Sequence, residues 1–428
     1  MIRVLVFPSC NEPGLEVINS LACSNKIMLF GGSSVDVEYD PSRLLLKNHL
    51  ACPSYYDSGF REMMEKLIEE HQIDVVFPTM DLLVAEFSRW HLPRTRFITP
   101  NSETAHLFLS KLRTYERLQG LVPVPRLYDF TNFELPAYAK PDIGSGSRGG
   151  MVVNTRDELQ MALEKGLLVM EYLPGAEFTV DCLNDLNGCL RFLHVRLRGK
   201  IGRNIALGTK GVFIAEVEDA VRRIAEEIRI EGPWFAQFKM DREGRPVLIE
   251  VNCRIAGSMT LTRLSGVNIP LLSVFLFLGY EVEIPRLIPD VLLNRCLRNL
   301  CEVKEFRWVI WDLDDTIIRK DGKPNPEAIA CLYDLNNRGV TQLLLTKNPD
   351  ADRLLKLHRI PIFFVEVRST DDKLAELERL MTTYGIEPET CIVVNDSMTE
   401  NLAIQKRFPQ LRVITPAMLD MLGREKIF

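Results

Sequence analysis

The sequence of 428 residues lacks the features typical of secreted, membrane-spanning or zinc-binding proteins. Its ten cysteines include no C-x-x-C pair and its six histidines show no pairing at metal-ligand spacing, so we expect neither a disulfide framework nor a zinc site. The most apolar run, Leu271 to Tyr280, is too short to cross a bilayer and is expected to form a buried helix. Met1 to Phe7 has a strand pattern rather than signal-peptide anatomy, and we therefore expect a cytoplasmic protein with free thiols.

An excess of positive charge is also missing. The formal net charge is -6, so the chain has no overall excess of positive charge that would favour binding to nucleic acid or to an anionic membrane. Apolar residues make up 46% and charged residues 26%, as in an ordinary soluble globular protein. The chain has no repeats and no low-complexity tract, and its length favours several domains.

The pattern of the chain indicates four segments. Residues 1–100 alternate strands with helices, including strands at Val4–Phe7, Lys26–Phe30 and Val75–Pro78 and an amphipathic helix over Gly59–His71, which predicts a parallel α/β domain. Residues 101–280 read as a mixed α+β domain with longer strands and a glycine-rich loop. Pro285 and Pro289 lie in a predicted linker over residues 281–304.

A second α/β domain is predicted over residues 305–428. Its candidate strands are Trp308–Trp311, Thr341–Leu345, Ile362–Val367 and Cys391–Val394, each followed by a helical pattern.

A glycine-rich segment, residues 144–150, follows a predicted strand that ends at Lys140 and Pro141. Glycines let backbone N–H groups approach phosphate oxygens, and a lysine neutralises their charge. The G-K-[ST] ending of a Walker loop is missing. Alone, the segment is compatible with either a phosphate-binding loop or a plain surface loop.

Further motifs favour the phosphate-binding interpretation. They are residues 169–177 (VMEYLPGAE), 178–181 (FTVD), 235–241 (FAQFKMD), and 246–254 (PVLIEVNCR), after a turn at Glu243 and Gly244. In this order and spacing they resemble the ATP-grasp superfamily, in particular its carbamoyl-phosphate-synthase-like branch. The resemblance covers roughly residues 1–280 and makes the first domain a pre-ATP-grasp domain.

The resemblance implies roles for individual residues and the use of ATP and Mg²⁺. The implied nucleotide-binding residues are Lys111 and Lys140 at the phosphates, Ser145, Gly146, Ser147 and Gly149 in a flap over them, Glu171, Tyr172 and Leu173 at the adenine, and Glu177 at the ribose. Gln237, Glu250 and Asn252 would face the metal, and Arg254 would stabilise the transferring phosphoryl group. Since Glu250 and Asn252 alternate with Val251, a strand would turn both to one face.

A basic segment lies between these motifs and contains Arg196, Arg198, Lys200, Arg203 and Lys210. Such a run is commonly a solvated face. Its place in the order of motifs suggests instead a loop near the phosphates and the acceptor, with Lys210 added to the nucleotide-binding set. We therefore expect an anionic substrate, either a carboxylate or a phosphate ester.

The segment D-L-D-D-T, Asp312 to Thr316, follows an apolar strand, and Thr346, Lys373 and Asp396 follow in further strand-end motifs. This order resembles the haloacid dehalogenase (HAD) superfamily over about residues 305–428. The resemblance implies that Asp312 is the nucleophile and Asp314 the general acid and base, while Thr346 and Lys373 hold the phosphoryl oxygens. Asp312, Asp396 and the carbonyl of Asp314 would bind Mg²⁺.

This segment departs from the HAD pattern in places. Asn395 stands where relatives often have Gly or Asp, Glu400 is a less usual late acid, and the proline that often follows the lysine is missing. The intervals between motifs leave no room for a cap domain, so the expected domain is a capless, Rossmann-like one with an open site.

The leading hypothesis is a bifunctional enzyme. The ATP-grasp part would be an ATP- and Mg²⁺-dependent ligase that activates a carboxylate as an acyl phosphate and joins it to an amine or another nucleophile. The HAD-like part would be a phosphomonoesterase acting on the substrate or product, either of which could be phosphorylated. The alternative is a small-molecule kinase with a regulatory or degenerate HAD domain. The oligomeric state is left open, a homodimer included.

Overall fold

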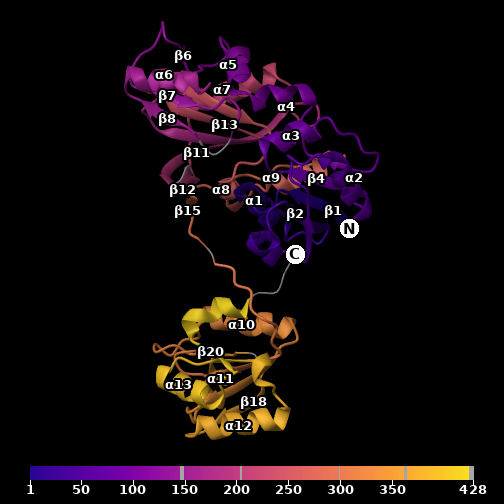
Figure 1. The fold of residues 1–428 in the computed structure, drawn as a ribbon, viewed down its shortest axis with the longest axis vertical. Helices are drawn as coiled ribbons and strands as arrows, with labels where there is room; N and C mark the ends of the chain where they lie inside the picture. Colours follow the sequence, from indigo (N-terminus) through magenta and orange to yellow (C-terminus); the bar gives the residue numbers. More distant parts are fainter. Residues whose placement is uncertain (145–148, 203–204, 298, 361–363, 424–428) are drawn as a thin grey trace. The chain divides into compact units, whose positions relative to one another are not determined.

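The computed structural model describes residues 1–423 except 145–148, 203–204, 298 and 361–363. The chain folds into two compact units, residues 1–297 and residues 298–427 (Figure 1). Each unit contains its own clusters of buried apolar side chains.

A parallel five-stranded sheet opens the first unit, in the order β3-β2-β1-β4-β5. Its strands are β1 (Ile2–Phe7), β2 (Ile27–Ser33), β3 (Asn48–Ala51), β4 (Val75–Pro78) and β5 (Arg96–Phe97), and its helices are α1 (Glu12–Leu21), α2 (Phe60–Glu70) and α3 (Asp81–Phe87). Val4 and Val6 pack in one apolar cluster, whereas Leu5 and Phe7 pack in another. Both faces of β1 are therefore covered, as parallel sheets require.

Two antiparallel sheets form the rest of the first unit. The smaller has the order β6-β9-β7-β8 and the larger the order β14-β13-β10-β11-β12-β15. The smaller contains β6 (Leu127–Tyr128), β7 (Ala137–Lys140), β8 (Met151–Val153) and β9 (Leu168–Glu171). The larger contains β10 (Glu177–Asn184), β11 (Leu190–Gly202), β12 (Ile205–Gly211), β13 (Gly232–Met240), β14 (Pro246–Asn252) and β15 (Leu292–Asn294).

Six helices accompany these sheets: α4 (Ser102–Leu109), α5 (Lys111–Leu118), α6 (Arg156–Glu164), α7 (Ala215–Glu227), α8 (Thr260–Leu264) and α9 (Ile269–Phe277). Helix α7 buries Val217, Val221 and Ile224, at helical spacing, in the same cluster as Val180 and Ala236 of the larger sheet. The predicted buried helix is confirmed as α9. Among the described residues, no helix is long and apolar enough to cross a membrane.

The second unit has a parallel five-stranded sheet in the order β18-β17-β16-β19-β20. Its strands are β16 (Trp308–Trp311), β17 (Thr341–Thr346), β18 (Phe364–Ser369), β19 (Cys391–Val394) and β20 (Arg412–Ile414). Its helices are α10 (Pro326–Asn337), α11 (Ala351–Leu357), α12 (Lys373–Tyr384) and α13 (Met398–Arg407). Between β16 and β17 the chain forms one helix, α10, and the described residues there include no inserted domain.

Short 3-10 helices lie at Val37–Tyr39, Pro41–Leu44, Pro388–Thr390 and Pro416–Leu422.

The mixed α/β architecture with several sheets confirms the coarse fold class. The predicted strands at the starts of both α/β regions are present, and the helix expected over Gly59–His71 is α2. Part of the segment predicted as a linker is not a free connection, however. Residues 292–294 form β15, which pairs with β12 through Thr209 and Leu293. Three residues are too few to give a readable strand pattern, which explains the difference.

Candidate active sites

Lys140 ends β7, and its ammonium group lies in the first candidate site. Its Nζ donates to the carbonyl oxygen of Ile249 at 2.9 Å, and the hydroxyl of Tyr115 donates to the same oxygen at 2.7 Å. Nζ also lies 5.6 Å from the centroid of the Tyr115 ring. Burial, together with the charge of Lys111, lowers the pKa of Lys140 to about 8, whereas Glu250 opposes the shift. The lysine is thus held by a neutral carbonyl and an aromatic ring.

Lys111 begins α5 and lies near Lys140. Its Nζ donates to the carbonyl oxygens of Asp142 at 3.0 Å and Gly144 at 2.8 Å. Both carbonyls belong to the segment that leads into the glycine-rich loop. Of the predicted flap residues, Ser145, Gly146 and Ser147 lie outside the described residues. Gly149 is described and has φ +76, a conformation that favours glycine, so the loop returns through a glycine-specific turn.

The segment predicted to hold the adenine follows β9. The Glu171 carboxylate accepts from Arg126, through the backbone N at 3.0 Å and through Nε at 3.2 Å. Its side chain is therefore paired with Arg126, the residue before β6. The assignment of this segment to the adenine stays a prediction. Leu173 is buried, and Lys239 Nζ lies 6.0 Å from the centroid of the Tyr172 ring.

Arg198 of β11 joins two residues that were predicted for different roles. Its Nη1 forms an ion pair with the carboxylate of Glu177 and donates to Oε1 of Gln237 at 3.2 Å. The predicted ribose-binding and metal-facing side chains are therefore close together. The prediction treated Arg198 as a substrate contact and missed this bridge.

The predicted metal-facing residues lie on adjacent strands. Gln237 of β13 is directly opposite Glu250 of β14. Glu250 and Asn252 are half-buried, while Val251 between them is in the core, as the strand alternation predicts. The charge of Glu250 acts on Lys140, which places the carboxylate and the ammonium in one region.

Among the described residues, no three His, Cys, Asp or Glu side chains converge to hold a metal ion. The predicted set has one carboxylate, from Glu250, with amide oxygens from Gln237 and Asn252. Oxygen donors of this type suit Mg²⁺, which keeps several waters and is completed by substrate phosphates. Cys253 is buried and burial raises the pKa of its thiol, so this side chain lies away from the metal-facing edge.

Arg254, predicted at the transferring phosphoryl group, forms a bidentate ion pair with Asp81. Nε and Nη2 donate to the two carboxylate oxygens at 2.7 and 3.0 Å. Its guanidinium also lies 5.2 Å from the centroid of the Phe235 ring. The end of β14 is thereby fixed to the first residue of α3.

The basic segment divides into separate environments. Arg196 is fully buried, and its guanidinium makes a bidentate ion pair with Asp181 at 2.6 and 2.7 Å and donates to Ser258 Oγ at 3.0 Å. The expectation that Arg196 faces an anionic substrate is therefore wrong, because its charge is neutralised in the interior. Lys210 is exposed on β12. Arg203 and the side chain of Lys200 lie outside the described residues.

The second candidate site lies at the carboxyl edge of the sheet in the second unit. Lys373 Nζ donates to Oδ1 of Asp312 at 2.9 Å, to Oε2 of Glu400 at 2.9 Å and to Oδ1 of Asn395 at 3.3 Å. Burial raises the pKa of Asp312 to about 6, against the opposing effect of Lys373. The carboxylate of Asp312, which follows the central strand β16, thus shares the positive charge of Lys373 with Glu400.

The other predicted residues of the second site lie around this pair. Thr346 is buried at the end of β17, and its Oγ1 accepts from the backbone N of Asn348 at 3.1 Å. Asn348 Nδ2 donates to Oδ1 of Asp314 at 2.9 Å. Asp396 is exposed after β19, and its charge helps to raise the pKa of Asp312. Asp312, Asp314 and Asp396 therefore share one edge, where the carboxyl ends of parallel strands meet.

Sequence reasoning missed several residues of these sites. Tyr115 lies one helical turn after Lys111, a spacing that could have drawn attention to it. Lys347 follows Thr346 and forms an ion pair with Glu400 at 2.8 Å, which no sequence pattern indicates. Arg295, inside the predicted linker, forms an ion pair with Glu12.

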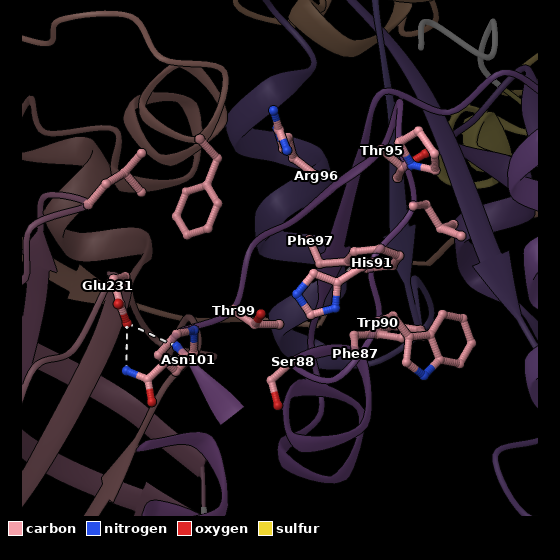
Figure 2. A pocket seen from close by; sticks show the side chains of 15 residues that line it. Phe87, Ser88, Trp90, His91, Thr95, Arg96, Phe97, Thr99, Asn101 and Glu231 are labelled. Carbon is pink, nitrogen blue, oxygen red and sulfur yellow. Dashed lines mark hydrogen bonds between the residues drawn. The ribbon is translucent and has the colours of Figure 1, made fainter. Parts of the chain in front are cut away.

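A cavity of about 460 Å³ lies elsewhere in the first unit, beside β5 and the start of α4 (Figure 2). Trp90, His91, Phe97 and Phe277 are among its lining residues, and none of the predicted site residues lines it. At its wall, Asn101 donates to Glu231 through its backbone N at 2.9 Å and through Nδ2 at 3.1 Å. The cavity is thus separate from the lysine and carboxylate groups described above.

Comparison with known proteins bears on the first unit. Residues 164–294 match the family described as ATP-grasp in the biosynthetic pathway with Ter operon. The carbamoyl phosphate synthase large chain of Clostridium acetobutylicum is 22% identical over 296 residues, which is 59% of this chain and 27% of that protein. The formate-dependent phosphoribosylglycinamide formyltransferase of Bacteroides thetaiotaomicron is 21% identical over 288 residues, 57% of this chain and 74% of that protein. The chain thus spans about a quarter of the first relative.

Solved structures give the same fold. The biotin carboxylase domain of the Hydrogenobacter thermophilus 2-oxoglutarate carboxylase, a domain dimer with MgADP, ADP and bicarbonate, has a TM-score of 0.54 at 19% identity and covers 65% of this chain and 70% of its own. The N5-carboxyaminoimidazole synthetase of Staphylococcus aureus with ADP has a TM-score of 0.55 at 15% identity, covering 67% and 80%. The L-amino acid ligase of Bacillus licheniformis has 0.51 at 17%, covering 65% and 74%. The first unit has the ATP-grasp fold.

Proposed function

We propose that the first unit binds MgATP and is a carboxylate–amine ligase. The observation that carries this proposal is the half-buried Lys140, which bonds a carbonyl and an aromatic ring rather than a carboxylate. Its charge is therefore available to a phosphate. Lys111 stands beside the same loop, and Glu250 faces the same region. A polyanionic nucleotide with Mg²⁺ is the ligand that satisfies two lysines and a carboxylate together.

The metal would be held by Glu250, with the amide oxygens of Asn252 and Gln237. When bound, Mg²⁺ neutralises charge on the phosphates. Glu177 would release Arg198 and accept hydrogen bonds from the ribose hydroxyls. The backbone after β9 would hold the adenine. Arg254, fixed by Asp81, would donate to the transferring phosphoryl group.

The chemistry that we propose has two steps. A carboxylate oxygen of the first substrate attacks the γ-phosphorus, and ADP leaves to give an acyl phosphate. The nitrogen of an amine then attacks the acyl carbon, the amine loses a proton, and inorganic phosphate leaves. Such transfers depend mainly on positioning and on charge neutralisation, which the lysines, Arg254 and the metal-facing oxygens supply.

For the second unit we propose phosphomonoester hydrolysis by a HAD-like site. Asp312 attacks phosphorus, and Asp314 protonates the leaving oxygen and then deprotonates the water that releases phosphate. Lys373 and Thr346 would hold the phosphoryl oxygens, and Asp312, Asp396 and the Asp314 carbonyl would hold a Mg²⁺ ion. The Lys373–Asp312 contact at the end of the central strand supports this assignment.

The test is incubation of the whole chain with ATP, Mg²⁺ and a panel of carboxylates and amines, followed by measurement of ADP and mass spectrometry of the products. A ligase forms ADP only when a carboxylate is present, and the product contains both substrates. If the two sites act in sequence, Asp312→Asn leaves ADP formation intact and a phosphorylated product accumulates. If that variant and the wild type give the same product, the scheme in which the two sites act one after the other is refuted.

The alternative, a small-molecule kinase with a regulatory or degenerate second site, predicts a different product. A stable phosphorylated acceptor would form with no ligation. Glu400 favours this alternative to a limited extent, because it shares Lys373 with Asp312. The same mass spectra therefore discriminate between the two functions.

A further inference from the structure

The two loops that follow β1 and β4 lie side by side at the carboxyl edge of the first sheet. In the strand order β3-β2-β1-β4-β5, the chain moves outward in one direction from β1 and in the other from β4. Ligands of open α/β sheets bind at such a switch point. Asn11, after β1, and Thr79, after β4, are joined by hydrogen bonds of 3.1 and 3.3 Å. The loops therefore form one connected edge.

Two ion pairs connect this edge to residues that directly follow β14 and β15. Asp81 holds Arg254, as described above. Glu12 holds Arg295, and both side chains keep about a quarter of their surface accessible. The Glu12 carboxyl group also packs on Gly257, where an added β-carbon would lie 2.5 Å from its Cδ atom. Gly257 comes three residues after Arg254, so the second pair lies beside the proposed phosphoryl-transfer group.

Helix α1 is also fixed against residues 260–268, which follow β14. Glu16 accepts from Arg263 Nε at 2.7 Å and from the Thr260 hydroxyl at 2.5 Å. The Asn268 amide donates to the carbonyl of Ser20 at 2.7 Å. These contacts, which centre on the buried Glu16, hold α1 in place without Glu12. The partly buried Glu12–Arg295 pair is thus not the contact on which the packing of α1 depends.

We propose that Glu12 and Arg295 bind the amine substrate of the ligase, and that this substrate is an α-amino acid. The inference rests on the proposed function of the first unit. The substrate carboxylate binds Arg295 in place of Glu12. The released Glu12 accepts from the substrate ammonium group and takes one of its protons, so that the neutral nitrogen can attack the acyl carbon.

The choice of a dipolar substrate follows from charge balance. Breaking a partly buried ion pair by removing one partner leaves an uncompensated charge, which is costly. A simple carboxylate at Arg295 would leave Glu12 without a cation, and a simple amine at Glu12 would leave Arg295 without an anion. A ligand with one positive and one negative group replaces both partners and keeps the local charge at zero.

The test uses the whole chain and an acceptor-dependent assay of ADP release. We expect Arg295→Ala and Glu12→Gln to raise KM for the amino acid about 10- to 100-fold, as for loss of a charge-assisted hydrogen bond, with KM for ATP little changed. In the wild type, the matching amino acid amide, which has no carboxylate, should be a poor substrate. Arg295→Ala should remove that preference. Arg94→Ala, at an exposed arginine, is the matched control.

A charge swap, Glu12→Arg with Arg295→Glu, separates binding from folding. The ion pair is retained, so Tm should stay near the wild-type value, while KM for the amino acid should remain as high as in the single variants. If the swap restores KM, or if amino acid and amide are used equally well by the wild type, the inference is overturned.

Failure of the proposed function has a different signature, which is no ADP release with any acceptor. Calorimetric titration of the amino acids into the protein with Mg²⁺ and a non-hydrolysable ATP analogue then decides the inference alone. Binding that is lost in Arg295→Ala and in the swap supports it. Absence of amino acid binding to the wild type overturns it.

Discussion

The two candidate sites each contain a lysine, but the charge of that lysine is neutralised in different ways. Lys140 bonds the carbonyl of Ile249 and lies against the ring of Tyr115. Lys373 is shared between the carboxylates of Asp312 and Glu400. Among the described residues Lys140 has no carboxylate partner, whereas Lys373 is already paired with two acids of the protein.

The two arrangements favour different chemistry. A desolvated lysine without a carboxylate contact is stabilised when a polyanion arrives, which is the reason for our proposal that the first site binds phosphates. In the second site Lys373 lowers the pKa of the buried Asp312 against the effect of burial. This arrangement favours a carboxylate nucleophile over tight binding of phosphate. The predictions that follow test this contrast.

The largest effect should come from Asp312→Asn. Loss of a nucleophile should lower phosphomonoesterase activity by about 10⁴-fold or more, while ADP formation by the first unit is unchanged. Hydrolysis of p-nitrophenyl phosphate with Mg²⁺ measures the first quantity and a coupled ADP assay the second. Asp315→Asn is the matched control, since Asp315 has φ +52, a conformation that Asn accepts, and should retain most activity. Equal activity of the two variants would reject Asp312 as nucleophile.

A smaller effect is expected for Lys140→Met. Removal of the cation from the phosphate site should weaken binding of ATP about 10- to 100-fold, with no effect on phosphomonoester hydrolysis. Calorimetric titration with ATP and Mg²⁺ measures the affinity. Lys165→Met, at an exposed position after α6, is the control and should bind as the wild type does. If both variants bind ATP equally well, the contrast between the lysines is wrong.

The second site should lose activity in acid. Burial raises the pKa of Asp312 to about 6, and only its carboxylate attacks phosphorus, so kcat/KM should fall about tenfold per pH unit below 6. Bound Mg²⁺ favours the carboxylate, and more Mg²⁺ should therefore move this acid limb to lower pH. A pH profile at two Mg²⁺ concentrations measures both effects. An acid limb near pH 4 that does not respond to Mg²⁺ would contradict the raised pKa.

The smallest effect is an uptake of protons by the first site. Lys140 has a pKa of about 8, and phosphates beside it should raise that value, so binding of ATP near pH 8 should take up about half a proton. Calorimetry in buffers of different ionisation enthalpy measures this uptake. It should disappear in Lys140→Met and diminish towards pH 6, where the lysine is already protonated.

Much of the fold could be predicted because the residues that carry it are local. The apolar runs of β1, β4, β16 and β19 have a strand pattern, and the alternation at Glu250 and Asn252 correctly gives their shared face. Short strands such as β15 and β5 were missed because two or three residues carry no period.

The candidate sites were harder to predict where they depend on pairing between distant segments. Arg196 and Arg198 have the same charge and lie on the same strand. Arg196 is nevertheless fully buried and forms an ion pair with Asp181, whereas Arg198 contacts both Glu177 and Gln237. Asp81 and Arg254 are far apart in the sequence, as are Glu12 and Arg295. Which basic residue meets which acidic one is decided by the packing of sheets, and a single sequence carries no sign of it.

Strand β15 has a consequence for how this chain can be divided. It covers the outer edge of β12 through Gly208, Thr209 and Lys210. A fragment that ends at residue 280 would leave those backbone groups without partners and expose an edge that can pair with a second molecule, which favours aggregation. A fragment that ends at residue 297 keeps the edge covered. The length of the tail, rather than the catalytic motifs, should therefore decide whether the ATP-grasp unit can be prepared alone.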